Sequence, residues 1–252
     1  MTTEAKLNPR PIVLLGGYWL GPWAWAEVVP LLEAAGHQVE VPVLPGLGDR
    51  TPPETVTLTD QADTVLALLR TLVEPVLVVH SGAGAIASAV TDRDPAAVAR
   101  VVYVDSGPVT NGQVPRPDLF GLTAVPVPTI EELDAMGPMT ADLSAEQRAE
   151  FVSRGVPQPG RVATATVELQ NPARLAVPST LVCCGISSEL ERQLAESGNP
   201  MFAPTLELSD LDFVDLPGGH WPMWAQPEAL AGVLVSLAGR TDRVRAVVHL
   251  AR

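Results

Sequence analysis

One stretch of the sequence decides the fold: Val76-Leu77-Val78-Val79-His80-Ser81-Gly82-Ala83-Gly84-Ala85-Ile86-Ala87-Ser88-Ala89-Val90. Before Ser81 the residues are apolar and mostly β-branched, which is typical of a buried parallel strand. After Ser81 the residues are small, and Ile86 and Val90 follow at helical spacing. A strand that turns into a helix at a single serine predicts a nucleophile elbow.

A nucleophile elbow requires particular residues around the serine. The sharp turn strains the serine backbone and requires small neighbours, which Gly82, Ala83 and Gly84 supply. It also places the amide of Gly82 at a helix N-terminus, where an oxyanion is stabilised. The stretch departs from G-x-S-x-G at Val79 and Ala83. The prediction that Ser81 is a nucleophile therefore rests on the strand–serine–helix context and on finding its partners further along the chain.

Composition narrows the class of protein. The chain has 252 residues, 46% of them hydrophobic and 18% charged, which fits one large globular α/β domain with an insertion. The net charge of −13 argues against binding to nucleic acid or anionic membranes. No apolar run reaches transmembrane length and no signal-peptide pattern is found, so we expect a cytoplasmic protein. The only two cysteines, Cys183 and Cys184, predict buried free thiols and no metal site.

Strand and helix patterns alternate along most of the chain. This alternation predicts a mostly parallel sheet flanked by helices, with ligands at the carboxyl ends of the strands. The helix after residue 58 is expected to begin at a Thr59 cap. The expected strands cover residues 12–15, 39–43, 76–80, 101–104, 180–184 and 213–216, and the other expected helices cover residues 22–35, 189–196 and 227–237.

The alternation stops over residues 108–178, a proline-rich region. Two short helical patterns within it open with capping boxes, Thr129 with Glu132 and Ser144 with Gln147. We interpret the region as a small inserted lid, and the alternative is a disordered linker. The chain is thereby divided into an α/β core of residues 1–107 and 179–238, a lid of residues 108–178, and a tail of residues 239–252 with no assigned role.

His220 is the expected partner of Ser81. It follows the last predicted strand in a glycine-rich turn ahead of a helix, and its place after the nucleophile suits a general base. His80 lies on the strand before the nucleophile and is expected to point away from it as a packed core residue. His37 is expected to be structural.

Two carboxylates compete for the third catalytic position. Asp105 ends the strand that follows the elbow, so the two strand ends should be neighbours in a parallel sheet. A later strand is followed by Ser187 and Ser188, at the place where such sheets more often carry an aspartate, and Glu189 is the nearest carboxylate there. We favour Asp105 and keep Glu189 as the alternative acid.

The loop after the first strand is expected to complete the site. Glycines there let the backbone approach a ligand, and the amide of Tyr18 is the expected second oxyanion donor beside that of Gly82. Gly17, Trp19 and Trp221 adjoin these positions and are expected to line an apolar substrate pocket.

At this point the chain resembles the α/β-hydrolase superfamily, and in particular its plant methylesterase and hydroxynitrile-lyase-like branch with bacterial esterase relatives. Residues 16–25, Gly-Gly-Tyr-Trp-Leu-Gly-Pro-Trp-Ala-Trp, are similar to the H-G-x-W-x-G-x-W-x-W opening of that branch. His80-Ser81-Gly82-Ala83-Gly84 and Gly219-His220 match its nucleophile and histidine positions. The resemblance implies Ser81 as nucleophile, His220 as base, and the amides of Tyr18 and Gly82 as the oxyanion hole.

Three hypotheses follow for the function. The first is a cofactor-free serine hydrolase that acts on a small to medium apolar ester through an acyl-enzyme on Ser81. The second is a non-hydrolytic biosynthetic enzyme on the same fold, a cyclase, isomerase or carbon–carbon lyase, motivated by serine at the usual acid position and by the atypical elbow sequence. The third is a ligand-binding protein with a vestigial triad. The substrate's identity and the oligomeric state are not predicted.

Overall fold

The structure, a computed structural model, describes residues 9–137 and 139–239, so most of the predicted tail lies outside the described residues. Its centre is a six-stranded sheet in the order β2-β1-β3-β4-β7-β8, in which every neighbouring pair is parallel. The predicted α/β fold is therefore confirmed. The strands are β1 (Ile12–Leu15), β2 (Val39–Glu40), β3 (Val76–His80), β4 (Arg100–Val104), β7 (Ser179–Cys183) and β8 (Leu211–Asp215).

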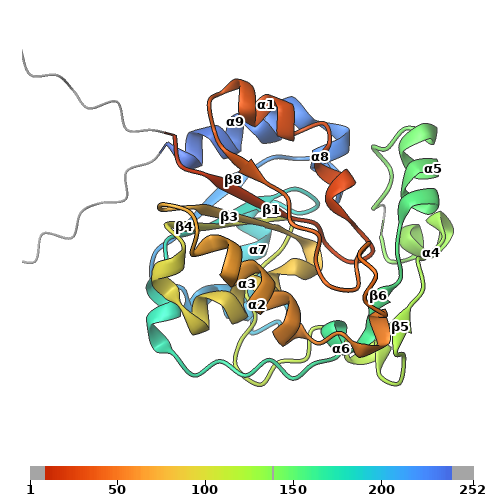
Figure 1. Ribbon diagram of the computed structural model, residues 1–252, viewed down its shortest axis with the longest axis horizontal. Helices are drawn as coiled ribbons and strands as arrows, with labels where there is room; N and C mark the ends of the chain where they lie inside the picture. Colours follow the sequence, from red (N-terminus) through yellow and green to blue (C-terminus); the bar gives the residue numbers. More distant parts are fainter. Residues whose placement is uncertain (1–8, 138, 240–252) are drawn as a thin grey trace, which may run out of the picture.

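Helices cover both faces of this sheet. In Figure 1, α1, α8 and α9 lie above the sheet and α2 and α3 lie below it. Side chains of one strand alternate between the two faces: Val76 and Val78 pack with the α1 and α9 residues, whereas Leu77 and Val79 pack with those of α2 and α3. The helices are α1 (Val29–Ala34), α2 (Leu58–Leu69), α3 (Gly84–Arg93), α7 (Ser188–Glu196), α8 (Pro222–Ala225) and α9 (Pro227–Ala238).

Part of the stretch between β4 and β7, residues 124–159, forms structure of its own at one side of the molecule (Figure 1). Capping boxes at Thr129 and Ser144 begin α4 and α5, as predicted. Leu133 and Phe151 are fully buried against the core around Trp221, so a disordered linker does not describe this stretch. The strands and α-helices between β4 and β7 are β5 (Ala124–Val125), α4 (Ile130–Ala135), α5 (Ala145–Arg154), β6 (Gln158–Pro159) and α6 (Gly160–Ala163), with β5 and β6 antiparallel.

Prolines shorten two of the predicted elements. The single helix expected over residues 22–35 is instead a 3₁₀ helix at Pro22–Trp25 followed by α1. Pro30 has no N–H to donate to the preceding turn, so it fits only the first turn of a new helix. The strand expected over residues 39–43 ends at Glu40. Pro42 cannot donate a ladder hydrogen bond, which ends the pairing at this edge of the sheet.

The predicted cap of α2 was wrong by two residues. The helix begins after Thr57, whose hydroxyl accepts a hydrogen bond from the amide of Asp60, while the Asp60 carboxylate accepts one from the amide of Thr57. This reciprocal pair satisfies two amides that the first helical turn would otherwise leave free. Thr59 lies inside the helix and is exposed.

Within the described residues, 9–137 and 139–239, no helix combines the length and apolar character needed to cross a bilayer. Cys183 and Cys184 are buried free thiols, as predicted. They belong to the two opposite core clusters of the sheet, because adjacent strand residues point to opposite faces.

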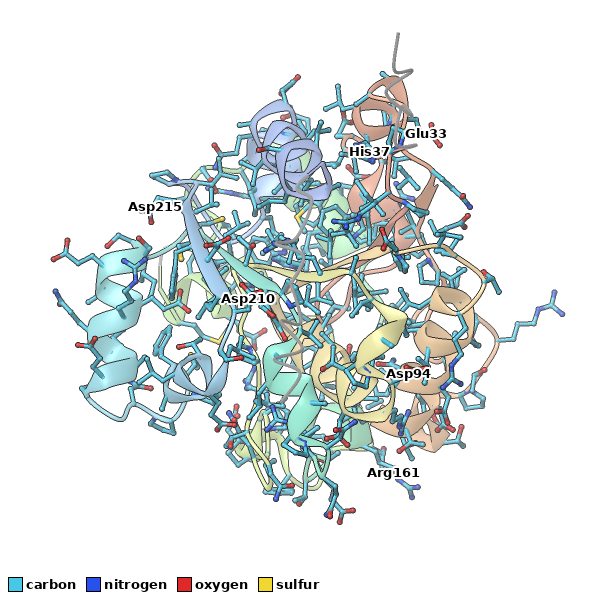
Figure 2. All side chains as sticks on the ribbon, turned by 90° about the vertical axis from the view of Figure 1, so that its left-hand side faces the viewer. Glu33, His37, Asp94, Arg161, Asp210 and Asp215 are labelled. Atoms are coloured by element: carbon cyan, nitrogen blue, oxygen red, sulfur yellow. The ribbon has the colours of Figure 1, made fainter. Side chains whose placement is uncertain are left out.

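His37 and His80 are both buried, as expected, but the ring of His80 does not point away from the site: its centroid lies 4.7 Å from that of His220. The Nδ1 of His37, labelled in Figure 2, lies 2.8 Å from the carbonyl oxygen of Arg10. His80 ends β3 and is 1% exposed, and its Nε2–H donates to the carbonyl of His220 at 2.7 Å. Burial, and secondly the positive field of His220, lower the pKa of His80 to about 3. His80 is therefore a neutral core residue.

Replacing Thr57 with alanine removes the cap of α2. We expect Thr57→Ala to lower the free energy of unfolding by about 1 kcal/mol, because the first turn then loses its side-chain acceptor. Urea unfolding followed by circular dichroism measures this loss. Thr59→Ala is the matched control and should change stability by much less. Equal losses for the two variants would contradict the assignment of the cap.

The buried His80 makes the fold sensitive to acid. Unfolding lets His80 take up a proton below its ordinary pKa of 6.5, while the folded state resists protonation down to about pH 3. Stability should therefore fall as the pH drops below 6.5, by on the order of 2 kcal/mol from this group by pH 5.

The measurement is urea unfolding at pH 7 and pH 5 for the wild type and for His80→Gln, whose amide can still donate to the same carbonyl. The glutamine variant should lose less stability than the wild type over this interval. An identical loss in both proteins would show that His80 does not carry the acid sensitivity.

Candidate active site

Ser81 lies at the turn between β3 and α3 with the strained backbone that the sequence predicts. Its φ angle is 51°, in the left-handed region that residues other than glycine rarely adopt. The hydroxyl of Ser106 donates to the carbonyl oxygen of Ser81 at 2.5 Å and so holds the turn. A short 3₁₀ turn at Ser81–Ala83 then leads into α3. The hydroxyl of Ser81 is thereby presented at the carboxyl edge of the sheet.

Three side chains from separate elements form one hydrogen-bonded chain. The Nε2 of His220, in the loop after β8, lies 2.9 Å from the Oγ of Ser81. The Nδ1 of the same ring lies 2.5 Å from the Oδ2 of Asp105 at the end of β4. Because a carboxylate only accepts, Nδ1 carries the proton and Nε2 is left free to accept the proton of Ser81. This is the arrangement that activates a serine hydroxyl as a nucleophile.

The structure places Asp105, and not Glu189, beside His220. Glu189 is exposed in the first turn of α7, where it accepts a hydrogen bond from Gln193 at 3.3 Å. The Oδ1 of Asp105 is fixed by the amides of Cys184 at 3.2 Å and Gly185 at 3.0 Å. The alternative acid is therefore not supported by the geometry.

The surroundings of Asp105 favour its ionised form. Burial opposes its ionisation, but the hydrogen bond and positive field of His220, together with the amide of Gly185, hold the pKa of Asp105 below its usual value. Asp105 itself has a φ of 42°, so its backbone is also strained. A fixed carboxylate in this position orients the imidazole and stabilises its protonated form.

Two glycines let the loop after β1 pack against Ser81 and Gly82. A Cβ on Gly17 would lie only 2.7 Å from the Cβ of Ser81. A Cβ on Gly82 would overlap the ring of Tyr18. These close approaches place the backbone around Tyr18 next to that of Gly82, and this adjacency is what two donors to one oxyanion require.

A cavity of about 630 Å³ opens over the hydrogen-bonded chain. Of the three residues expected in the substrate pocket, Trp19 and Trp221 line this cavity and Gly17 does not; Tyr18 lines it as well. Gly17 is covered by Ser81 and His80 and lines a much smaller space behind Tyr18 instead. The other apolar residues of the cavity wall include Val109, Met136, Met139, Ile186, Met201 and Phe202.

One contact that holds the histidine loop was not predicted from the sequence. The Oδ2 of Asp142, between α4 and α5, accepts the amide of Gly219 at 2.5 Å. The amide of His220 itself donates to the carbonyl oxygen of Met139 at 3.4 Å. The insertion thus positions the backbone on which His220 stands. No local pattern around Asp142 distinguishes it from other loop aspartates.

No group of three or more histidine, cysteine, aspartate or glutamate side chains is placed to hold a metal ion in the part of the chain that the structure describes. The chemistry that the arrangement offers is nucleophilic attack by a serine, with proton transfer through a histidine.

Comparison with known proteins agrees with the fold. The Alpha/beta hydrolase family matches residues 12–233. The chain is 36% identical over 105 residues to Methylesterase 7 of Arabidopsis thaliana, which covers 39% of this chain and 40% of that protein. It is 37% identical over 123 residues to a pimeloyl-[acyl-carrier protein] methyl ester esterase of Aromatoleum aromaticum, which covers 47% of each. The chain thus spans less than half the length of these curated relatives.

A solved structure supports the same assignment over a longer span. The extracellular alpha/beta-hydrolase from a Paenibacillus species superimposes with a TM-score of 0.75 over 92% of this chain and 100% of that one, at 22% identity. At this identity the likeness establishes the fold and not the activity. Because the family match extends over most of the sequence, the chain belongs to the alpha/beta hydrolase family.

Proposed function

We propose that the protein is a cofactor-free serine carboxylesterase that cleaves a small to medium apolar ester through an acyl-enzyme on Ser81. The observation that carries the proposal is the hydrogen-bonded chain from Asp105 through His220 to Ser81 at the base of the cavity. The relatives named above are esterases, which supports the ester class of substrate.

The first half of the reaction forms the acyl-enzyme. The Nε2 of His220 accepts the proton of Ser81 while Oγ attacks the ester carbonyl carbon. The amides of Tyr18 and Gly82 donate to the oxyanion of the tetrahedral intermediate. When the intermediate collapses, the carbon–oxygen bond to the alcohol breaks and His220 gives its proton to the departing oxygen.

The second half of the reaction frees the enzyme. Water enters the cavity and loses a proton to His220 as it attacks the acyl carbon. Collapse of the second intermediate breaks the bond to Ser81, which regains its proton from His220, and the acid is released. Throughout both halves the carboxylate of Asp105 holds the imidazole in position and balances its positive charge.

The cavity indicates the size and polarity of the substrate. Its volume of about 630 Å³ lies in the range of sites for small organic molecules. Its wall is mainly apolar and includes Trp19 and Trp221, both of which pack against Phe151. We assign residues 108–178 the role of a lid, because Met136 and Met139 of this stretch line the cavity. Specificity would then depend on the lid.

One of the two observations behind the non-hydrolytic hypothesis is the serine at the usual acid position, and Asp105 provides a carboxylate for His220 in its place. Serine follows β7 where an aspartate is more usual, but Asp105 reaches His220 from β4 instead. The vestigial-triad hypothesis predicts binding without turnover, which the experiments below distinguish from catalysis.

The net charge and the buried thiols of the protein support a proposal for its location and its partners. The net charge of −13 disfavours nucleic acid and anionic membranes as partners. Two buried free thiols fit a reducing compartment, and we propose the cytoplasm. The expected partner is a small-molecule ester.

Loss of the Ser81 hydroxyl should abolish turnover. We expect the wild type to hydrolyse p-nitrophenyl esters between acetate and octanoate and to be labelled at Ser81 by a fluorophosphonate, identified by peptide mass spectrometry. Ser81→Ala should lower kcat by roughly 10⁴-fold or more, because no nucleophile remains. A folded wild type that neither turns over any chain length nor becomes labelled would contradict the esterase proposal.

The identity of the acid can be tested with two isosteric variants. Asp105→Asn should lower kcat/KM by roughly 10³–10⁴-fold, because the neutral amide neither fixes the tautomer of His220 nor balances its charge. Glu189→Gln is the control and should retain wild-type kcat/KM. Initial rates with the best p-nitrophenyl ester measure both. A collapse of activity in Glu189→Gln, with Asp105→Asn active, would reverse the assignment.

A further inference from the structure

A buried carboxylate that the proposed mechanism does not use lies in the wall of the catalytic cavity. Glu191, on α7, is only 7% exposed and lines the same cavity as Ser81 and His220. Carboxylates are almost never buried to this degree unless they are paired. The position of Glu191 therefore calls for a partner.

The helix that carries Glu191 is firmly anchored. The Ser187 hydroxyl accepts the amide of Leu190 and so caps the helix N-terminus. Asp215, labelled in Figure 2 at the end of β8, accepts the amide of Ser188 at 2.6 Å and its hydroxyl at 2.9 Å. These contacts fix the first turn, so Glu191 is held at the cavity by the fold.

The contacts of Glu191 within the described residues satisfy it only in part. Its Oε2 accepts from the thiol of Cys183 at 3.3 Å, and a thiol is a weak donor. A carboxylate offers about four acceptor positions on its two oxygens. No arginine of the described chain forms an ion pair with it. The carboxylate is left with acceptor capacity that no described residue fills.

Two arginines, Arg192 on the same helix and Arg116 on the cavity wall, have other partners than Glu191. The guanidinium of Arg192, the next residue on α7, lies over the ring of Phe213, 4.2 Å from its centroid. Arg116, on the cavity wall, forms a bidentate pair with Asp118 at 2.9 and 2.6 Å. The positive field of Arg192 offsets the burial of Glu191 only in part, and desolvation still raises the pKa of Glu191 above its usual value.

We propose that Glu191 is a specificity-determining residue that accepts a hydrogen bond from a donor group on the substrate, an ammonium or a hydroxyl placed away from the ester carbonyl. The inference rests on the proposed esterase function and narrows its substrate class. An apolar cavity with one unfilled acceptor in its wall binds an ester whose body is apolar and whose far end carries the donor. A donor at that place removes the cost of the buried carboxylate, and an alkyl group of the same size does not.

Three methyl esters of equal shape test the proposal: methyl 4-(aminomethyl)benzoate, methyl 4-(hydroxymethyl)benzoate and methyl 4-ethylbenzoate. Methyl 6-aminohexanoate and methyl heptanoate form a flexible pair that tests the same preference without a rigid ring. Hydrolysis is followed by chromatography of the released acids. In the wild type, kcat/KM for each donor ester should exceed that for its alkyl counterpart, by about tenfold for the ammonium.

Glu191→Gln is the informative variant, because its amide oxygen can still accept from Cys183 while the negative charge is gone. It should remove most of the tenfold preference for the ammonium and leave the alkyl esters within about twofold of the wild type. Glu196→Gln, an exposed position on the same helix, should keep the full preference. Equal discrimination in the wild type and Glu191→Gln, in both ester series, would overturn the proposal.

Binding is measured separately from turnover, so that the two proposals fail independently. Calorimetric titration of Ser81→Ala, with and without Glu191→Gln, gives the affinity for the aminomethyl and ethyl esters. A Glu191-dependent preference in binding, with no hydrolysis by the wild type, would contradict the esterase function and support the role of Glu191. Hydrolysis with no such preference in either measurement would support the esterase and overturn the role of Glu191.

Discussion

The backbone of Ser81, at a φ of 51°, is the constraint on which the site depends. Such a conformation costs on the order of 1–3 kcal/mol and persists only where the surrounding structure imposes it. Here β3 fixes one side of the turn, α3 fixes the other, and the hydroxyl of Ser106 holds the carbonyl between them. The loop at Gly17 then packs against the serine from a third direction, which only a residue without a side chain permits.

Strand register explains why the acid comes from β4. His80 pairs with Val104 in the parallel sheet, so Ser81 and Asp105 are the next residues of two neighbouring strands. Val104 in turn pairs with Val182, which brings the amides just beyond β7 to the carboxylate of Asp105. The last strand, β8, lies beside β7 and delivers the loop of His220 to the same edge. The hydrogen-bonded chain of Asp105, His220 and Ser81 is therefore a consequence of how three strand ends meet.

Local sequence patterns predicted much of this arrangement. They could not predict the contacts between segments that are distant in the sequence. Only a few consecutive residues define each of the predicted local features: the elbow, the two capping boxes between β4 and β7, and the turn that holds His220. Choosing between Asp105 and Glu189 required the sheet register, which no single segment contains. Pro30 and Pro42 are local signals that indicate a helix start and a strand end, and the predicted boundaries did not take them into account. The contact of Asp142 with the histidine loop and the burial of Glu191 depend on packing between distant segments, so neither has a pattern in the sequence.

The most direct test of the account is a crystal structure of the protein after reaction with an alkyl phosphonofluoridate. The account predicts a phosphorus–oxygen bond to Ser81, with the phosphoryl oxygen between the amides of Tyr18 and Gly82, and with His220 still hydrogen-bonded to Asp105. The alkyl group should lie in the cavity between Trp19 and Trp221. An adduct on another residue, or a phosphoryl oxygen that neither amide contacts, would contradict the central claim that these residues form one catalytic unit.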